Sequence, residues 1–204
     1  MIVLIRHAEP EGAFKTAFGH TDLPLSETGR RQAQELGEAL KNYRADHLFV
    51  SPLTRAKDTA APLVENWLMT PEYRPDMKEI FLGEWEGLPF EQIRHLWPED
   101  YERRGKDLSN FAAPGGESFL QLQQRTVPEL ERAAGFDGTS FMVCHAGVMR
   151  VLLCYALGIP LQKLFSFMPR HAYASVLTKG RNGWVLEAFN QSPAALAQYL
   201  GCGA

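Results

Sequence analysis

Short apolar runs that alternate with helix-like segments are the feature that most constrains the fold of this chain. Residues 2–5 are a continuous, largely β-branched apolar run, and residues 140–144 form a second short run. Ser26 and Ser51 are good N-cap residues, and each precedes a segment with apolar residues at helical spacing. Strands that helices cover on both faces read as continuous apolar runs. We therefore predict an α/β fold with a mostly parallel sheet.

Local signals predict the individual elements and one antiparallel edge. Ser118 and Gln121 form a capping box that begins a helix, and Pro128 is expected to kink it. Asn182-Gly183 is a turn signal between two strand-like runs, which predicts a hairpin at the edge of the sheet. The expected elements are strands at about 2–5, 47–50, 140–144, 173–178 and 184–189, and helices at about 26–43, 51–67, from 118, 148–157 and in the last fifteen residues.

Residues 80–117 have a composition unlike the rest of the chain. Glycine, proline and aromatic residues are concentrated there, which is typical of short helices joined by loops. We predict a helical and loop insertion, laid over the sheet and the active site, within a single domain that spans residues 1–204. Its aromatic residues are expected to form a small core, with Trp85 as a candidate pocket-lining side chain.

Charge and cysteine usage argue against several classes of partner. The 204 residues include 21 lysines and arginines and 24 aspartates and glutamates, which gives a formal net charge of −3. Binding to nucleic acid or an anionic membrane through a basic face favours a positive chain, and no run reaches the ~18 apolar residues of a membrane span. The three cysteines form no C-x-x-C pair, which favours a reducing compartment. We predict a soluble cytoplasmic protein without a nucleic-acid or membrane partner, and the sequence indicates no particular oligomeric state.

Cationic and imidazole side chains follow the predicted strands. Arg6 and His7 come directly after the first strand, His145 follows residues 140–144, and Arg55 lies near the start of the helix that follows a third strand. Ligands of open parallel sheets bind at the carboxyl ends of the strands. Arginine grips phosphate oxygens with two nitrogens, and a helix N-terminus adds N–H donors. The sequence therefore predicts a phosphate pocket for a small phosphomonoester.

A histidine in such a pocket can attack phosphorus, which divides a slow reaction into two easier steps. Nearby arginines lower the pKa of that histidine by like-charge repulsion and so keep it neutral. The leaving oxygen then needs a proton donor. Glu79 is the preferred candidate because it precedes the glycine-rich and tryptophan-rich segment, but its spacing leaves Glu84 and Glu86 as rivals.

Five segments resemble, in the same order, the motifs of the histidine phosphatase superfamily, the phosphoglycerate-mutase-like enzymes. They are R-H-A-E at 6–9, S-P-L-T-R-A-K-D-T-A at 51–60, E-I-F-L-G-E-W-E-G at 79–87, P-G-G-E-S at 114–118 and V-C-H-A-G-V-M-R at 143–150. Five motifs in order are far more specific than one. Gly19-His20 further resembles the G-H pair of the α-ribazole phosphatase branch. Within the superfamily, the chain is most similar to this branch and to the broad-specificity phosphatases.

This resemblance implies a three-layer αβα sandwich and a reaction without a metal or other cofactor. It implies that His7 is the nucleophile that becomes phosphohistidine, and that Arg6, Arg55 and His145 hold the phosphate together with it. Among the three glutamates it implies Glu79 as the proton donor, because the family acid lies four residues before the glycine that Gly83 matches. It also implies that Gly19 and His20 bind on the substrate side. The expected activity is the metal-independent hydrolysis of small phosphomonoesters, with α-ribazole 5′-phosphate as a candidate substrate.

Other functions remain open from the sequence alone. Cofactor-dependent phosphotransfer of the phosphoglycerate mutase type uses the same motifs, although the chain lacks the longer insertion and tail of those mutases. Alanines at 8, 13 and 146 depart from the family pattern, and they motivate a non-catalytic phosphate-binding protein as an alternative. A metal-assisted hydrolase is a third alternative, although the adjacent arginines would repel a cation. His171 is expected to stay outside the crevice. Arg103, Arg104 and Arg150 are expected to be solvated, although Arg150, one turn into its helix, could instead pair with a residue behind the site.

Overall fold

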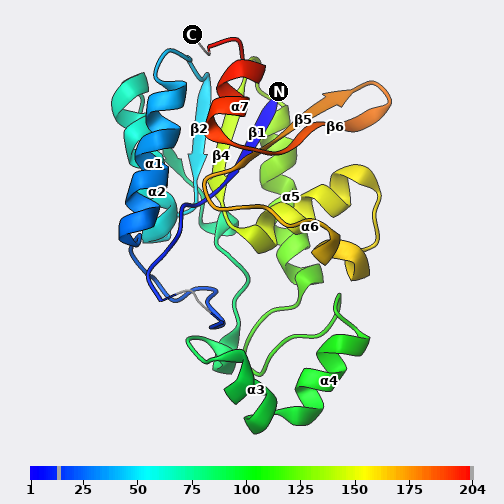
Figure 1. Cartoon of the computed structure of the whole chain (residues 1–204). Coiled ribbons are helices and arrows are strands. Elements are labelled where there is room, and N and C mark those ends of the chain that lie inside the picture. Colours follow the sequence, from blue (N-terminus) through cyan, green and yellow to red (C-terminus); the bar gives the residue numbers. More distant parts are fainter. Residues whose placement is uncertain (13–14, 203–204) are drawn as a thin grey trace.

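The computed structural model describes residues 1–12 and 15–202. Within them, six strands form one sheet in the order β3-β2-β4-β1-β5-β6 (Figure 1). The first four of these strands are parallel neighbours, and β5 and β6 form an antiparallel hairpin beside β1. This arrangement confirms the predicted, mostly parallel sheet with an antiparallel edge. The strands are β1 (Ile2–Arg6), β2 (His47–Val50), β3 (Glu72–Tyr73), β4 (Ser140–Cys144), β5 (Ala174–Gly180) and β6 (Gly183–Gln191).

Helices cover both faces of the sheet, as predicted for a three-layer sandwich. One face packs against α1, α2 and α7, and the other packs against α5 and α6 (Figure 1). The α-helices are α1 (Glu27–Leu40), α2 (Thr54–Trp67), α3 (Phe90–Leu96), α4 (Pro98–Lys106), α5 (Phe119–Ala134), α6 (Ala146–Leu157) and α7 (Pro193–Tyr199). The 3₁₀ helices are η1 (Pro75–Met77), η2 (Gly83–Trp85) and η3 (Leu161–Ser166). None of the helices in the described part of the chain is long and apolar enough to cross a bilayer.

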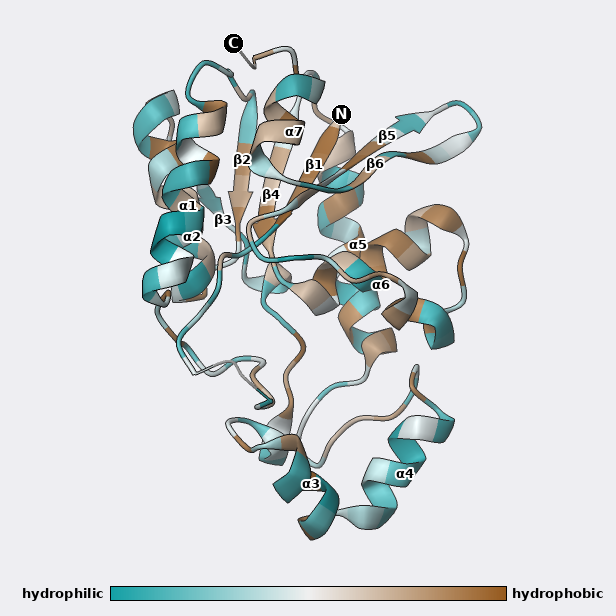
Figure 2. Ribbon diagram, viewed as in Figure 1, coloured by the Kyte–Doolittle hydropathy of each residue, from teal (hydrophilic) through white to brown (hydrophobic). Residues whose placement is uncertain are grey.

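Alternate side chains of β1 pack into two separate hydrophobic cores. Val3 and Ile5 pack with α1 and α2, whereas Ile2 and Leu4 pack with α5 and α6. All four are buried, because successive side chains of a strand point to opposite faces of the sheet. Figure 2 shows β1 and β4 in hydrophobic colours, whereas the outer faces of α1 and α2 are hydrophilic. This double burial explains why the sequence shows a continuous apolar run.

Three serines were expected to begin helices, and two of them do. The Ser26 hydroxyl accepts the Gly29 N–H at the start of α1, and Ser118 forms the predicted capping box of α5. The prediction that Ser51 caps α2 is wrong, because α2 begins only at Thr54. The carboxylate of Asp22 instead accepts the N–H and the hydroxyl of Thr54, at 2.6 and 2.8 Å. Ser51 is therefore free for another contact.

Residues 80–117, here called the lobe, contain η2, α3 and α4 joined by loops, as predicted. The lobe lies beyond the carboxyl ends of the parallel strands and not on a face of the sheet (Figure 1). It has a small core around Trp85 and Ile93, to which Ala17 of the first long loop contributes. Trp85 is 3% exposed and stacks near Phe111, so it belongs to this core and does not line a pocket.

Candidate active site

The register of the parallel strands brings two histidines to one edge of the sheet. Arg6 pairs with Cys144 across β1 and β4, so the next residues, His7 and His145, leave their strands side by side. Their ring centroids are 5.1 Å apart. Ser51 follows β2 at the same edge and donates its N–H to Val143 O. The side chains that follow three strands thus meet where the sequence placed the phosphate pocket.

His7 is held as a neutral imidazole with one free lone pair. Its Nδ1 lies 2.7 Å from the carbonyl oxygen of Ala8, which can only accept, so Nδ1 carries the proton and Nε2 has the lone pair. Burial, followed by the charges of Arg6 and Arg55, holds the pKa of His7 well below its usual value. A neutral imidazole with an unprotonated Nε2 is the form that can act as a nucleophile.

His145 is fixed by the residue that was wrongly predicted as a helix cap. Its Nε2 lies 2.7 Å from the hydroxyl oxygen of Ser51, while its Nδ1 is buried without a hydrogen-bond partner. Burial, then His7 and the guanidiniums of Arg55 and Arg6, lower the pKa of His145 well below its usual range. The ring is therefore neutral, and if Ser51 donates to Nε2, Nδ1 is left as an N–H donor.

Arg6 and Arg55 are charged residues near these rings; Arg6 is half-buried and Arg55 is buried. Arg6 donates from Nη1 to Pro169 O at 2.9 Å, and its Nε is buried without a partner. Burial lowers the pKa of Arg6 to about 10, against the opposing effect of Glu79. Arg55 donates to Gly19 O and Thr21 O and so anchors the first long loop. Both guanidiniums remain cationic at neutral pH.

Glu79 is oriented by two N–H groups, and the structure separates it from its rivals. Its Oε2 accepts from Gly147 N at the start of α6 and its Oε1 accepts from Ile80 N, both at 2.9 Å. A Cβ atom at Gly147 would lie 2.2 Å from Glu79 Oε1, so this approach requires glycine. Glu84 is exposed, and Glu86 accepts N–H bonds from residues 19–21. Among the three glutamates, only Glu79 faces α6.

Three buried nitrogen atoms around His7 have no hydrogen-bond partner among the described residues. They are Arg6 Nε, His145 Nδ1 and Nε2 of His171. A buried polar atom without a partner costs about 1–3 kcal/mol, and such atoms are rare in folded proteins. Nitrogen atoms that can donate, placed near the charges of Arg6 and Arg55, match the oxygens of a bound anion. The site is therefore suited to an anion such as a phosphate group.

Comparison with known proteins decides the family. A model described as the histidine phosphatase superfamily (branch 1) matches residues 2–192. The chain belongs to this superfamily. All five segments that carry the sequence resemblance lie within the matched residues, so the predicted family is confirmed.

Two relatives of this histidine phosphatase are named as phosphatases. Phosphoserine phosphatase 1 of Hydrogenobacter thermophilus is 32% identical over 182 residues, which cover 86% of this chain and 85% of that protein. The adenosylcobalamin/α-ribazole phosphatase of Salmonella typhimurium is 29% identical over 167 residues, 80% of this chain and 83% of that protein. The solved α-ribazole phosphatase of Shigella flexneri superposes with a TM-score of 0.86 at 25% identity, and the match covers 94% of this chain and 96% of that one.

Gly19 and His20, expected on the substrate side, lie against the lobe. Gly19 is buried, and a Cβ atom there would lie 1.9 Å from Ile80 O. The His20 ring stacks on Phe81 with centroids 5.0 Å apart. The Glu86 carboxylate accepts the backbone N–H of both residues, at 3.1 and 2.8 Å. This loop is therefore held next to Glu79, and the substrate-side role of Gly19 and His20 stays a prediction.

The departures from the family pattern are tolerated where the structure describes them. Ala8 is fully buried and packs with Leu25, Ala33 and Ala172. Its N–H donates to Thr59 Oγ1 at 2.8 Å. The alanine at position 146 is the first residue of α6 and does not disturb the helix. The alanine at position 13 lies outside the described residues.

Sequence reasoning missed three residues of this site. His171 was expected to stay outside the crevice, which is wrong, because its ring centroid lies 5.5 Å from that of His7. Arg150 is not solvated as expected but half-buried, and its Nε donates to Phe167 O at 2.9 Å. Arg125 of α5 donates to Glu79 O and forms an ion pair with the carboxylate of Glu117. No motif assigned these roles, although Glu117 is part of P-G-G-E-S.

Proposed function

We propose that this histidine phosphatase hydrolyses small phosphomonoesters through a phosphohistidine on His7. As a member of its superfamily the chain is a phosphatase. One observation carries the proposal of the nucleophile: the Nε2 lone pair of a buried, neutral imidazole stands among buried N–H donors that lack partners. Such donors suit the oxygens of a phosphoryl group, for which positioning and charge neutralisation supply most of the catalysis.

In the first step, Nε2 of His7 attacks the phosphorus atom, and the bond from phosphorus to the ester oxygen breaks. Arg6 and Arg55 neutralise the nonbridging oxygens, and His145 donates from Nδ1 to the same group. The neutral state of His7 matters, because a protonated His7 has no lone pair to form the new bond. The contact between His145 and Ser51 keeps Nδ1 aimed inward.

Glu79 serves the proton transfers in both steps. It protonates the leaving oxygen when the ester bond breaks, and it then accepts a proton from the water that attacks phosphohistidine. The second step releases inorganic phosphate and restores the lone pair on Nε2 of His7. The two N–H bonds from Ile80 and Gly147 hold the carboxyl group in one orientation through the cycle.

The direct test is release of inorganic phosphate from p-nitrophenyl phosphate in the presence and absence of EDTA. We expect turnover that EDTA does not change, because the arginines and not a metal carry the positive charge at the site. Among the described residues, no three histidine, cysteine, aspartate or glutamate side chains are grouped as a metal site requires. The EDTA experiment tests the prediction that the reaction needs no metal.

Three outcomes would contradict the proposal in different ways. Loss of turnover in EDTA would indicate a metal-assisted hydrolase. Phosphate binding without any turnover would indicate the non-catalytic binding protein. Conversion of 3-phosphoglycerate to 2-phosphoglycerate with a trace of the bisphosphate, without release of free phosphate, would indicate a mutase.

We propose α-ribazole 5′-phosphate as one candidate substrate. It is the substrate class named for the relative from Salmonella typhimurium. The stacked rings of His20 and Phe81 lie beside Glu79, and burial lowers the pKa of His20. A neutral imidazole next to a phenyl ring offers an apolar, aromatic wall to the base of such a leaving group.

A second candidate is a phosphomonoester whose leaving group carries a carboxylate, such as phosphoserine. Arg104 of the lobe and Arg150 of α6 both lie over the ring of Phe165, at 5.6 and 4.9 Å from its centroid. Burial lowers the pKa of both arginines, and within the described chain neither has a carboxylate partner. Half-buried cations without a counter-ion favour an anionic ligand.

Replacing Arg104 with methionine tests the choice between these substrates. If the leaving group carries a carboxylate, R104M should lower kcat/KM for phosphoserine by about 10-fold or more and leave p-nitrophenyl phosphate nearly unchanged. Arg103 is the matched control, because its side chain is 73% exposed. The aromatic substrate would be favoured if R104M and wild type hydrolyse phosphoserine at equal rates and wild type hydrolyses α-ribazole 5′-phosphate faster than phosphoserine.

We also propose that residues 1–204 act as one domain in the cytoplasm, without a nucleic-acid partner. The packing of Ala17 into the core of the lobe supports the first point, since it ties the lobe to the loop that follows β1. The free thiols of Cys144, Cys154 and Cys202 support a reducing compartment. The net charge of −3 favours a small-molecule partner.

A further inference from the structure

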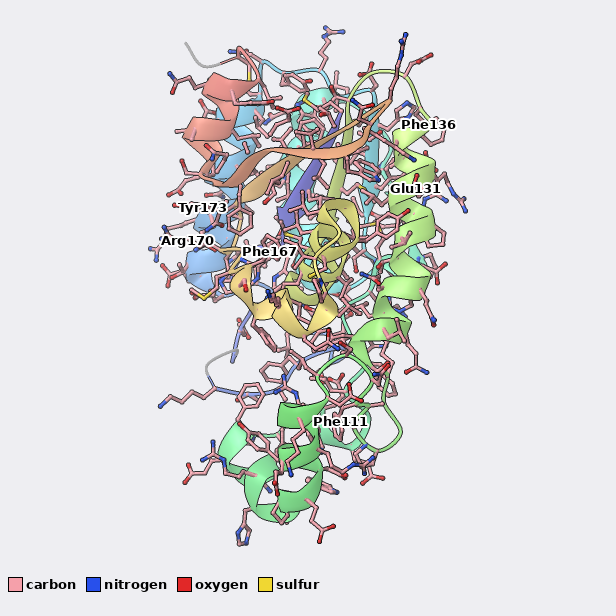
Figure 3. The ribbon with its side chains drawn as sticks, turned by 90° about the vertical axis from the view of Figure 1, so that its right-hand side faces the viewer. Phe111, Glu131, Phe136, Phe167, Arg170 and Tyr173 are labelled. Atoms are coloured by element: carbon pink, nitrogen blue, oxygen red, sulfur yellow. The ribbon has the colours of Figure 1, made fainter. Side chains whose placement is uncertain are left out.

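His171 is a half-buried histidine beside the nucleophile that no motif of the sequence assigns. It lies in residues 167–173, here called the strap, which connect η3 to β5. Figure 3 shows Phe167, Arg170 and Tyr173 along the strap between η3 and the β5–β6 hairpin. The planes of the His171 and His7 rings are tilted by 43°. The position of this ring raises the question of what its polar atoms contact.

The strap is fixed to two strands by the two residues that precede His171. Pro169 O accepts from Arg6 Nη1 at 2.9 Å, and the N–H of Arg170 donates to Asn190 Oδ1 at 2.8 Å. One bond ties the strap to β1 and the other ties it to β6. The ring is therefore positioned by the two strands that flank β5 and is not a free surface side chain.

The residue after His171 has a strained backbone. Ala172 has φ of 57°, in the left-handed region that residues with a side chain rarely adopt. Its N–H donates to Arg6 O at 3.0 Å, and it is 2% exposed. Strain of this kind persists where the surroundings impose it and is concentrated at functional sites. The turn at Ala172 sets the strap beside His7 before the chain enters β5.

The chemistry of the His171 ring fits a ligand better than packing. Its Nε2 is buried and has no hydrogen-bond partner in residues 1–12 and 15–202. An apolar side chain would fill the space without this loss. Burial, followed by the charge of Arg6, lowers the pKa of His171 to about 3. The ring is therefore neutral at pH 7 and can donate one hydrogen bond without adding a charge. Arg6 Nε and His145 Nδ1 are unpartnered in the same way.

We propose that His171 donates a hydrogen bond from Nε2 to a nonbridging oxygen of the phosphoryl group during its transfer to and from His7. The inference rests on the proposed function and adds a phosphate-contacting residue to it. Such a donor would stabilise the negative charge on the nonbridging oxygens in the transition state. A neutral donor also leaves the lone pair of His7 without a further positive neighbour.

Glutamine and methionine at position 171 form a matched pair for the test. Both side chains are unbranched and similar in size, and only glutamine can donate a hydrogen bond. We expect H171M to raise the inhibition constant of orthovanadate and to lower kcat/KM for p-nitrophenyl phosphate, each by about 10- to 100-fold. H171Q should recover most of both losses. His47 is half-buried at the opposite edge of the sheet, so H47M is the control and should match wild type.

The outcomes separate this inference from the function on which it rests. Equal losses in H171Q and H171M would show that the ring acts only through its shape, and no change in either would show that it does not contact phosphate. Either result overturns the inference while wild-type turnover persists. Absence of turnover in the wild type would overturn the proposed function itself. Thermal melting of both variants identifies a loss that comes from unfolding, and the vanadate constant of the folded fraction then decides.

Discussion

Replacing His7 with asparagine is expected to lower kcat/KM for p-nitrophenyl phosphate by at least about 1,000-fold, because the nucleophile itself is removed. Asparagine can still donate an N–H toward Ala8 O, as Nδ1 of His7 does, but it has no lone pair that attacks phosphorus. Arg6, Arg55 and His145 remain in place. Inorganic phosphate should therefore bind H7N with an affinity close to that for wild type.

Detection of the covalent phosphoenzyme distinguishes loss of the nucleophile from other causes of lost activity. Wild-type protein mixed with radiolabelled substrate and quenched in base should retain a label that acid removes, and H7N should retain none. H95N is the control, because His95 is exposed on α3. A wild-type protein that turns over without any covalent label, or an H7N variant that keeps the wild-type rate, would show that water attacks phosphorus directly.

The residues that the sequence placed correctly are those that follow parallel strands. A strand such as β1 or β4 is recognisable from a short apolar run, and parallel neighbours end at the same edge. His7 and His145 could therefore be brought together without knowledge of the strand order. Glu79 needed the family resemblance, because its position depends on Arg125 and on the start of α6. Neither contact leaves a local signal in the sequence.

His171 was missed because it precedes an antiparallel strand. β5 runs antiparallel to β1, and Ile5 pairs with Ala174, so the beginning of β5 lies beside the end of β1. The rule that sites form where strands end excludes such a residue. Only the strand order places His171 at the site, and strand order depends on long-range pairing that local patterns do not specify.

Arg150 and Ser51 were misjudged for related reasons. A charged residue one turn into a helix is expected to reach solvent, but Arg150 is covered by the strap through its bond to Phe167 O. Ser51 followed by proline is a typical helix start, yet the Asp22 carboxylate at Thr54 sets the actual start of α2. In both cases a loop that is distant in sequence supplies the competing hydrogen bond.

Replacing Glu79 with glutamine is expected to slow the hydrolysis of alkyl phosphomonoesters by about 100- to 10,000-fold, the usual contribution of a general acid and base. An alkoxide is a poor leaving group and depends on the proton from Glu79, whereas p-nitrophenolate leaves without help. The loss of kcat/KM should therefore be larger for phosphoserine than for p-nitrophenyl phosphate. Glutamine is isosteric and keeps an oxygen for one of the two N–H groups, from Ile80 or Gly147.

The size of this difference between the two leaving groups decides the role of Glu79. E86Q is the comparison, because Glu86 holds residues 19–21 by their N–H groups and so should affect both substrates alike by loosening the loop. If E79Q slows both substrates equally, Glu79 acts by holding α6 against the site and not by donating a proton. If E79Q behaves as wild type on phosphoserine, the proton comes from another group, and among the described residues His20, beside Glu79, is then the next to replace.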